Sequence, residues 1–290
     1  MSFREEFSFR KFGFQDIAIE RFCIFQWRAP GAIYVFYRLV LAVYTNVWLT
    51  LKAINPNVDT YFPLPWGAYL TNWTYILLTI YFTVHAIVTI VVYAICRGSG
   101  LPFLHRRCSV DHWRLFHEVN QSAGYEIISG QEEQRESVYT IRNSIPWYMG
   151  LVWLLFSAAS VATINDTFVF WAILVPGSKF GTLNTDNEQM HLVNCVLVAL
   201  EHAVTAIPIR LLHVIYPIMY GFVYVFFSIF YWVDNHDHVM YPILEWGNLG
   251  PTIGYVFLIG FVIIPVVHIC FYILYRLKIA LFRCCCQESA

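Results

Sequence analysis

The sequence is poor in charged residues. Lys, Arg, Asp and Glu together make up 13% of its 290 residues, whereas soluble domains usually carry about 25%. The formal net charge is −1, so no basic excess indicates a nucleic-acid partner. A Gly-rich phosphate-binding loop is also missing, because the segment 97–100 lacks the length and the lysine of that motif. Residues 1–29 mix charged and aromatic residues and do not have the pattern of a cleavable signal peptide.

In place of charge, the chain has long apolar stretches. Hydrophobic residues make up 58% of it and aromatic residues 18%. A helix of about 20 apolar residues crosses a hydrocarbon core of ~30 Å, and six stretches are near this length. We therefore predict an all-α integral membrane bundle of six transmembrane helices, at residues 31–51, 68–95, 146–164, 187–206, 212–232 and 251–275.

The basic residues predict which helix ends face the cytosol. Fifteen of the 18 Lys and Arg residues lie before the first stretch, in loop 96–145, at Arg210 or after the last stretch. Because cytosolic loops are enriched in Lys and Arg, we expect both termini and this loop to be cytosolic. The chain then divides into a cytosolic or interfacial segment 1–30, a six-span domain 31–275 and a cytosolic tail 276–290. The sequence leaves open whether the membrane is the plasma membrane or an endomembrane.

Two segments carry residue patterns of covalent modification. Cys284, Cys285 and Cys286 follow several basic residues just beyond the last apolar stretch, a position that favours S-palmitoylation. An unmodified tail is the alternative. The sequon Asn165-Asp166-Thr167 lies in the predicted outer loop 165–186, but it is next to a helix end, so a glycan is possible there and not expected.

Disulfides, metals and cofactors are not expected. None of the eight cysteines falls in a predicted outer loop, so structural disulfides would have to form in the reducing cytosol. Three adjacent cysteines do not converge on a metal ion. The outer segment Asp234–His238 contains two histidines and two carboxylates, but no fixed helical spacing brings them together. We interpret that segment as an acidic, solvated loop.

Arg38 and Glu201 are ionisable residues inside predicted helices, where charge is costly. At ~1.5 Å per residue, each lies about 10 Å from the inner end of its helix. Equal depth and opposite charge predict a buried ion pair that fixes the packing of the first and fourth helices. A direct role in catalysis or transport is the alternative. His85 and His268, near the inner ends, are interpreted as packing or interfacial residues.

Thr71 and His191 each lie about one turn into a helix from its predicted outer end. A hydroxyl becomes a useful nucleophile when a neighbouring base, usually histidine, takes its proton. Asn194 shares a helix face with His191 and could orient the imidazole or donate to an oxyanion. The alternative is structural, because a threonine and a histidine at one depth occur by chance in many six-span proteins.

Several motifs resemble the rolling stone family of animal membrane proteins. They are Phe12-Gly13-Phe14, Gln26-Trp27, Tyr37-Arg38, Tyr69–Thr74, Met190-His191 with Asn194 and Glu201, and Tyr241–Trp246. The match extends over nearly the whole chain. It implies a membrane protein associated with myoblast fusion, and it does not supply a chemical mechanism.

A more distant resemblance does imply a mechanism. Tyr69-Leu70-Thr71, the segment Asn187–His191 and the segment Tyr241–Glu245 are similar to motifs of the androgen-induced and androgen-dependent hydrolases. That family has six spans and cleaves fatty acid esters of hydroxy fatty acids with a threonine and a histidine, which match Thr71 and His191 here. The chain departs from it at Glu188, where that family has a further histidine, and in the long loop 96–145.

Two functions therefore remain open. In the first, Thr71 attacks a fatty acyl ester, His191 acts as general base, Asn194 orients the pair, and no metal or cofactor takes part. Membrane lipids are then the partners and a lipid ester is the substrate. In the second, the protein is a non-enzymatic membrane organiser in cell–cell fusion, and the same residues pack helices through interhelical hydrogen bonds. A transporter is disfavoured because no inverted repeat is visible.

Overall fold

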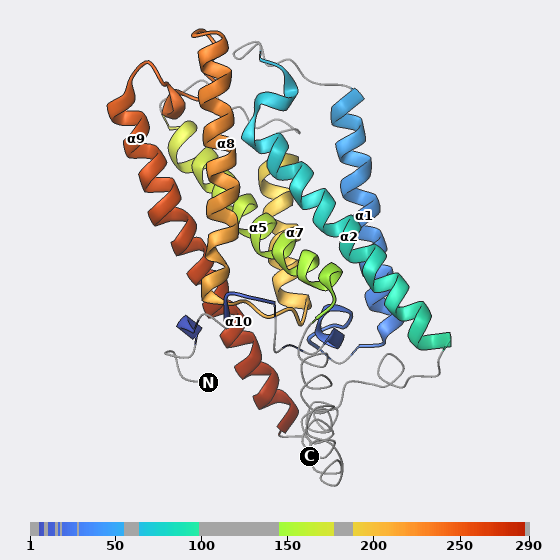
Figure 1. Ribbon diagram of the computed structural model, residues 1–290. Coiled ribbons are helices and arrows are strands. Elements are labelled where there is room, and N and C mark those ends of the chain that lie inside the picture. Colours follow the sequence, from blue (N-terminus) through green and yellow to red (C-terminus); the bar gives the residue numbers. More distant parts are fainter. Residues whose placement is uncertain are drawn as a thin grey trace, which may run out of the picture.

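The computed structural model describes residues 6–8, 11–14, 17, 19–27, 29–54, 64–98, 145–176 and 188–287. Within these ranges the fold is all-helical, with no β-strand and a single isolated bridge between Phe25 and Thr205. The predicted fold class is confirmed to this extent (Figure 1). Residues 99–144, which form most of the predicted loop 96–145, lie outside the described residues, as does the side chain of Cys286.

The helices are the following, in chain order. The α-helices are α1 (Gly31–Ile54), α2 (Leu70–Gly98), α5 (Trp147–Val169), α7 (Asn194–Val204), α8 (Ile215–Asp234), α9 (Leu249–Leu258) and α10 (Ile264–Gln287). Three π-helical turns extend or join them, namely η6 (Phe170–Leu174), η7 (Glu188–Val193) and η10 (Ile259–Ile263). Short 3-10 turns are η3 (Ile19–Phe22), η4 (Trp66–Ala68), η8 (Leu211–Val214) and η9 (Pro242–Leu244).

Five helical stretches in the described ranges are long and apolar enough to cross a membrane. They are residues 31–54, 70–95, 147–174, 211–234 and 249–285. The remaining predicted span forms a shorter helix, made of the 6 residues of η7 and the 11 residues of α7. It packs against α5 and α10 within the bundle. The chain is thus an apolar helical membrane bundle, and the sixth crossing stays a prediction.

Two helices extend beyond their predicted ends, which had been placed at residues 164 and 275. The third continues through η6 to Leu174, and the last runs from Leu249 to Gln287. Each extension includes a charged residue that is buried and has partners inside the bundle, namely Asp166 and Lys278. Asp166 and Lys278 are only 8% exposed.

Helix α5 occupies the middle of the bundle (Figure 1). It packs against α2, α7, α8 and α10, and its central run Ser157–Thr163 consists mostly of small residues. Small residues let neighbouring helices approach closely, which is how helices associate in lipid. The outer helices instead expose large apolar side chains such as Phe36, Phe230 and Phe257. This surface suits contact with hydrocarbon.

The described part of segment 1–30 packs into the end of the bundle where α1 begins (Figure 1). Phe22 and Cys23 are fully buried, and the Phe22 ring meets Trp153 edge-on at 5.8 Å. The Gln26 amide donates to the Val204 carbonyl at 2.8 Å. The sequence predicted a segment lying on the membrane surface, whereas residues 22–26 help to close the bundle.

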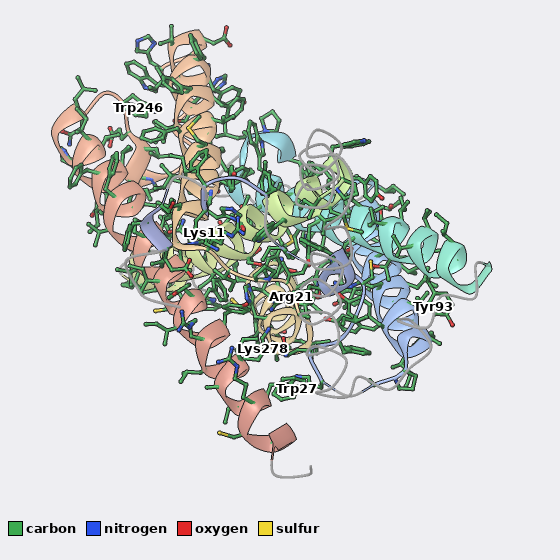
Figure 2. All side chains as sticks on the ribbon, turned by 60° about the horizontal axis from the view of Figure 1, so that its bottom comes forward. Lys11, Arg21, Trp27, Tyr93, Trp246 and Lys278 are labelled. Carbon is green, nitrogen blue, oxygen red and sulfur yellow. The ribbon has the colours of Figure 1, made fainter. Side chains whose placement is uncertain are left out.

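The link that follows α7, residues 205–210, is extended and buried, so its carbonyl groups need donors, as do the last carbonyl groups of α7 itself. Lys278 Nζ donates to His202 O at 2.6 Å and to Thr205 O at 2.7 Å. Trp27 Nε1 and Arg21 Nε donate to Ala203 O and Ala206 O at 2.7 and 3.0 Å. Figure 2 shows this end of the molecule, with Arg21, Trp27 and Lys278 near the end of α7. Basic residues expected in the cytosol are thus part of the packed structure.

Candidate active site

Thr71 and His191 are bridged by a residue that the sequence analysis did not select, Asp166. Thr71 lies in the first turn of α2, and its Oγ1 donates to Asp166 Oδ1 at 3.1 Å. On the other side, His191 Nδ1 lies 3.3 Å from Asp166 Oδ2. Among the described residues no hydrogen bond joins Thr71 directly to His191. The carboxylate therefore links α2, α5 and η7 at one point.

The His191 ring is fixed by packing as well as by Asp166. It is 3% exposed and stacks on the Phe170 ring, with centroids 4.0 Å apart and planes 10° from parallel. Thr167 Oγ1 also donates to the His191 carbonyl at 3.2 Å. Residues 166, 167 and 170 all belong to the α5–η6 helix, so one helix positions both the ring and the backbone of His191.

Asp166 was missed because the predicted third helix ends at residue 164. The sequence places the polar triplet Asn165-Asp166-Thr167 in an outer loop, where a glycan is possible but not expected. Instead it lies inside the helix, with Asn165 only 5% exposed. A glycan on the buried Asn165 amide does not fit this fold. The available signal was an acidic residue directly after an apolar stretch, since such residues in membrane helices usually have a partner.

The three π-helical turns among the described residues all border this region. Phe170 belongs to η6, His191 to η7, and Ile259 and Gly260 to η10. π-Turns are rare and are found frequently at functional sites, where the extra residue changes the direction of side chains. This observation marks the region independently of Thr71 and His191.

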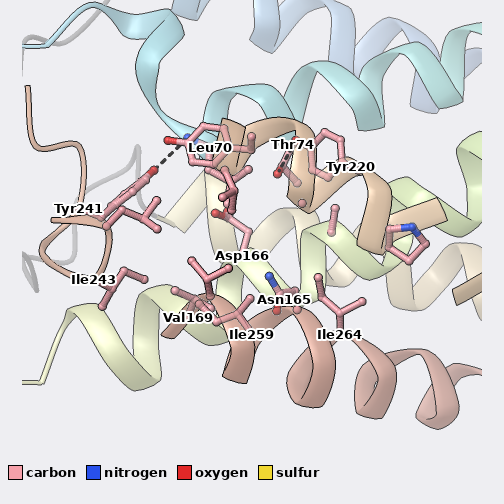
Figure 3. A pocket seen from close by; sticks show the side chains of 18 of the residues that line it. Leu70, Thr74, Asn165, Asp166, Val169, Tyr220, Tyr241, Ile243, Ile259 and Ile264 are labelled. Atoms are coloured by element: carbon pink, nitrogen blue, oxygen red, sulfur yellow. Dashed lines mark hydrogen bonds between the residues drawn. The ribbon is translucent and has the colours of Figure 1, made fainter. Parts of the chain in front are cut away.

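A cavity opens beside Thr71 and Asp166 (Figure 3). Its volume is about 90 Å³, several times the 10–15 Å³ that one water needs. Helices α2, α5, α8 and the α9–η10 helix form its walls, and most of its lining is apolar. The polar part of the lining includes the side chains of Thr71, Asn165 and Asp166. It also includes Thr74 and Tyr220, whose hydroxyl oxygens are 3.2 Å apart. The Asn165 Oδ1 atom is buried and has no partner among the described residues.

Tyr241 covers the same cavity from the loop between α8 and α9. Its hydroxyl accepts a hydrogen bond from the Leu70 amide at 3.0 Å (Figure 3), and its ring meets Tyr69 edge-on at 6.2 Å. Burial raises the pKa of Tyr241, and the negative charge of Asp166 raises it further. The phenol therefore keeps its proton and can still donate a hydrogen bond. Two of the motifs that carry the family resemblance thus meet at this site.

Asn194 lies one turn beyond His191, and its side chain bonds to the backbone of its own helical segment. Its Nδ2 donates to the Met190 carbonyl at 2.8 Å, and its Oδ1 has no partner among the described residues. No hydrogen bond in the described part of the chain links Asn194 to the His191 ring. The geometry gives it no direct part in orienting the imidazole.

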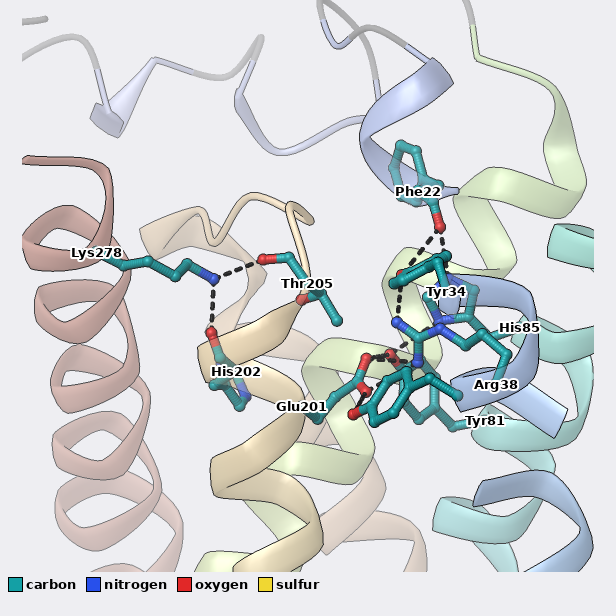
Figure 4. Close-up of polar contacts among 10 residues, drawn as sticks. Phe22, Tyr34, Arg38, Tyr81, His85, Glu201, His202, Thr205 and Lys278 are labelled. Atoms are coloured by element: carbon teal, nitrogen blue, oxygen red, sulfur yellow. Dashed lines mark hydrogen bonds and ion pairs between the residues drawn. The ribbon is translucent and has the colours of Figure 1, made fainter. Parts of the chain in front are cut away.

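Arg38 and Glu201 form a buried pair far along the bundle from Thr71. Arg38 Nη1 lies 2.8 Å from each Glu201 carboxylate oxygen. Tyr37 and Tyr81 also donate to Glu201, while His85 contacts both the Tyr81 hydroxyl and the Phe22 carbonyl (Figure 4). The cluster ties α1, α2 and α7 to the N-terminal segment. It lies on no wall of the cavity described above, which indicates a structural role.

The remaining candidate groups stay apart. His236 packs against Trp232 and His238 against Tyr231, with ring centroids 4.2 and 4.6 Å apart. No three His, Cys, Asp or Glu side chains in the described ranges are arranged to hold a metal ion. Cys284 and Cys285 are exposed on the last turns of α10. His268, predicted to be a packing or interfacial residue, is buried, and its Nε2 lies 2.9 Å from the Arg210 carbonyl oxygen.

Comparison with known proteins gives two matches. A family model described as protein rolling stone matches residues 122–287, which include Asp166 and His191. The chain is also similar to protein rolling stone of Drosophila melanogaster, with 24% identity over 295 residues. That alignment covers 96% of this chain and 90% of the fly protein. No solved structure matches the chain.

Proposed function

The chain belongs to the rolling stone family, and we propose that it is a six-span membrane protein that hydrolyses fatty acyl esters of lipids. The observation that carries this proposal is the Asp166 carboxylate, which contacts Thr71 Oγ1 at 3.1 Å and His191 Nδ1 at 3.3 Å. It lies beside an apolar cavity. A hydroxyl, a base within reach and a group that fixes the base are what nucleophilic ester cleavage requires.

In the proposed reaction, Thr71 Oγ1 bonds to the ester carbonyl carbon while its proton passes to Asp166. Collapse of the tetrahedral intermediate breaks the bond to the alcohol oxygen, which leaves with that proton. Water then attacks the acyl-threonine ester, gives a proton to Asp166 and releases the fatty acid as Thr71 regains the proton. The sequence assigned the base to His191. The contact between Thr71 and Asp166 favours the carboxylate as first acceptor, with His191 positioning it.

The same wall offers donors for the developing oxyanion. The Tyr241 hydroxyl and the Asn165 amide both face the cavity that Thr71 lines. A donor that is already fixed and shielded from water stabilises charge more strongly than water does. The apolar remainder of the cavity suits a fatty acyl chain, so we expect lipid esters rather than polar esters as substrates.

A hydrolysis assay tests this proposal. Membranes that contain the wild type, Thr71→Ala or Thr79→Ala would be incubated with long-chain fatty acyl esters, and released fatty acid measured by mass spectrometry. Thr79 is the matched control, because it is buried in α2 and donates only to its own helix, at Tyr75 O. We expect release by wild type and Thr79→Ala and at least a 100-fold loss in Thr71→Ala. Equal rates in all three would contradict the proposal.

A second candidate is a non-enzymatic membrane organiser in cell–cell fusion. It is favoured by the interhelical contacts of Asp166, a hydrogen bond from Thr71 and a close approach of His191 Nδ1, which join three helices and would stabilise packing in lipid without any chemistry. In that case Thr71→Ala would keep its fusion phenotype in a cell-fusion assay. Loss of fusion in Thr71→Ala, with Thr79→Ala unaffected at equal expression, would instead connect fusion to the reaction.

We also propose that both termini are cytosolic and that the exposed Cys284 and Cys285, with Cys286, carry palmitate. Their place at the end of α10, after Arg276 and Arg283, supports modification at the inner membrane surface. Metabolic labelling with an alkynyl palmitate tests it. We expect label on the wild type and none on the triple variant Cys284→Ser, Cys285→Ser and Cys286→Ser, and unchanged labelling of the triple variant would contradict it.

A further inference from the structure

The cavity beside Thr71 extends between two helices toward the outer surface of the bundle. On one side are Gly221 and Phe222 of α8, and on the other are Ile259 and Gly260 of η10. Helix α8 and η10 are in direct contact. Their contact line therefore forms part of the cavity wall.

Two glycines keep this part of the wall thin. A Cβ placed on Gly260 would meet no heavy atom within 4 Å, and one on Gly221 would meet only Ile264 Cδ1, at 3.6 Å. A side chain at either position would therefore occupy free space in or beside the cavity without striking the backbone. Gly260 also lies in a π-turn, which widens the helix locally.

The outward side of the same wall is an aromatic pair. Phe222, which lines the cavity, contacts Phe261, with ring centroids 5.9 Å apart and planes at 65°. Phe261 is 51% exposed and its neighbour Phe257 is 60% exposed. These rings therefore belong to the exposed apolar surface of the bundle, and the Phe222 ring connects that surface to the cavity lining.

We propose that a single fatty acyl chain enters the cavity from the bilayer between α8 and η10, past Phe222 and Phe261, and lies along Gly260. The apolar lining and the apolar surface outside it select hydrocarbon over water or a polar metabolite. The polar end formed by Thr71, Asp166 and Asn165 then receives the ester group. The placement of the ester group at Thr71 rests on the proposed function, whereas binding of the acyl chain in the cavity does not.

A photocrosslinking experiment tests the entry route. The purified full chain would be placed in nanodiscs with a phosphatidylcholine that carries a diazirine in one acyl chain, and crosslinked residues mapped by mass spectrometry. Label on Phe257 and Val262, which are exposed on the outer surface, serves as the internal reference for lipid contact. Label on the cavity residues Ile218 and Ile259 reports a chain inside.

Two glycine variants give the matched comparison. Gly260→Phe adds a ring at a residue that lines the cavity, whereas Gly254→Phe adds the same ring to the same helix at an open position that does not line it. We expect cavity label, relative to the reference, to fall at least tenfold in Gly260→Phe and to stay unchanged in Gly254→Phe. If Gly260→Phe does not fold, Gly260→Leu should give a smaller but clear loss. Cavity label that persists in the folded Gly260 variant, or is absent from wild type, would overturn the inference.

The Thr71→Ala variant separates this inference from the proposed function. We expect it to keep the cavity label of the wild type, because Thr71 acts on the ester and the chain is held elsewhere. Cavity label together with no hydrolysis by wild type would support the acyl-chain site and contradict the proposed ester hydrolysis. If hydrolysis is lost in Thr71→Ala but wild type shows no cavity label, the proposed hydrolysis is supported and the entry route is overturned.

Discussion

Asp166 shows how much one side chain decides in this protein. Its two carboxylate oxygens contact Thr71 and His191, which belong to helices far apart in sequence. A carboxylate buried in an apolar bundle is costly unless its oxygens have partners. Here the partners are the two residues that the sequence selected as nucleophile and base. Asp166 therefore holds the helices of the site together and, in the proposed reaction, accepts the first proton.

The Arg38–Glu201 pair makes a prediction at the same scale. Removal of one partner leaves an uncompensated buried charge, which costs about 3–5 kcal/mol, whereas replacement of both by apolar residues costs far less. Thermal midpoints of the purified protein in detergent measure this. Glu201→Leu should lower the midpoint strongly, and the double variant Arg38→Leu with Glu201→Leu should recover most of the loss. If the midpoint of the double variant falls by as much as the falls in Arg38→Leu and Glu201→Leu added together, the two residues are not energetically coupled.

At the scale of elements, the buried link between α7 and α8 depends on donors from distant helices. Lys278 of α10 supplies two of them, to the carbonyls of His202 and Thr205. This contact holds the end of α7, which is the helix that carries His191 at its other end through η7. The last helix thus lines the cavity with Ile264 and, through Lys278, also holds the far end of the helix that carries His191.

We expect Lys278→Met to destabilise the fold. Two buried carbonyls lose their donor, and an unsatisfied buried group costs about 1–3 kcal/mol. Arg276→Met is the control, because Arg276 is exposed on the same helix and donates only to Tyr272, at 2.9 Å. The thermal midpoint should fall clearly in Lys278→Met and little in Arg276→Met. An equal fall in both would show that charge on α10, and not the carbonyl contacts, determines stability.

For the whole molecule, orientation in the membrane is the open prediction. The positive-inside pattern places both termini in the cytosol and the loop 235–248, which contains Tyr241, outside. Epitope tags at each terminus and after His236 test it in intact and selectively permeabilised cells. Terminal tags should be detected only after permeabilisation of the membrane, and the His236 tag on the opposite side. Termini on opposite sides would show an odd number of crossings and contradict the six-span proposal.

The sequence was sufficient for the helical class and for most helix positions, because apolar length is a strong local signal. It also selected Thr71, His191, Arg38 and Glu201, which the structure places in two separate clusters. Asp166 could not be recognised in the same way. Its role depends on burial between helices, and a polar triplet after an apolar run looks the same in a loop.

The buried basic residues were missed for a related reason. Arg210 is 3% exposed, donates to the Gly13 carbonyl at 2.5 Å and lies over the Trp153 ring at 4.6 Å. Lysine and arginine near helix ends are usually solvated or reach headgroups, so their sequence position predicts the side of the membrane. It does not predict that an extended link nearby will need their hydrogen bonds.

Labelling of Thr71 is the most direct test of the central claim. Membranes with wild type, Thr71→Ala, Asp166→Asn or Thr79→Ala would be treated with a fluorophosphonate, and the adduct located by mass spectrometry. Asp166→Asn keeps the shape of the side chain but removes the proton acceptor. The account predicts an adduct on Thr71 in wild type and Thr79→Ala, and none in Thr71→Ala or Asp166→Asn. A folded wild type without any adduct on Thr71, or an equal adduct in Asp166→Asn, would contradict it.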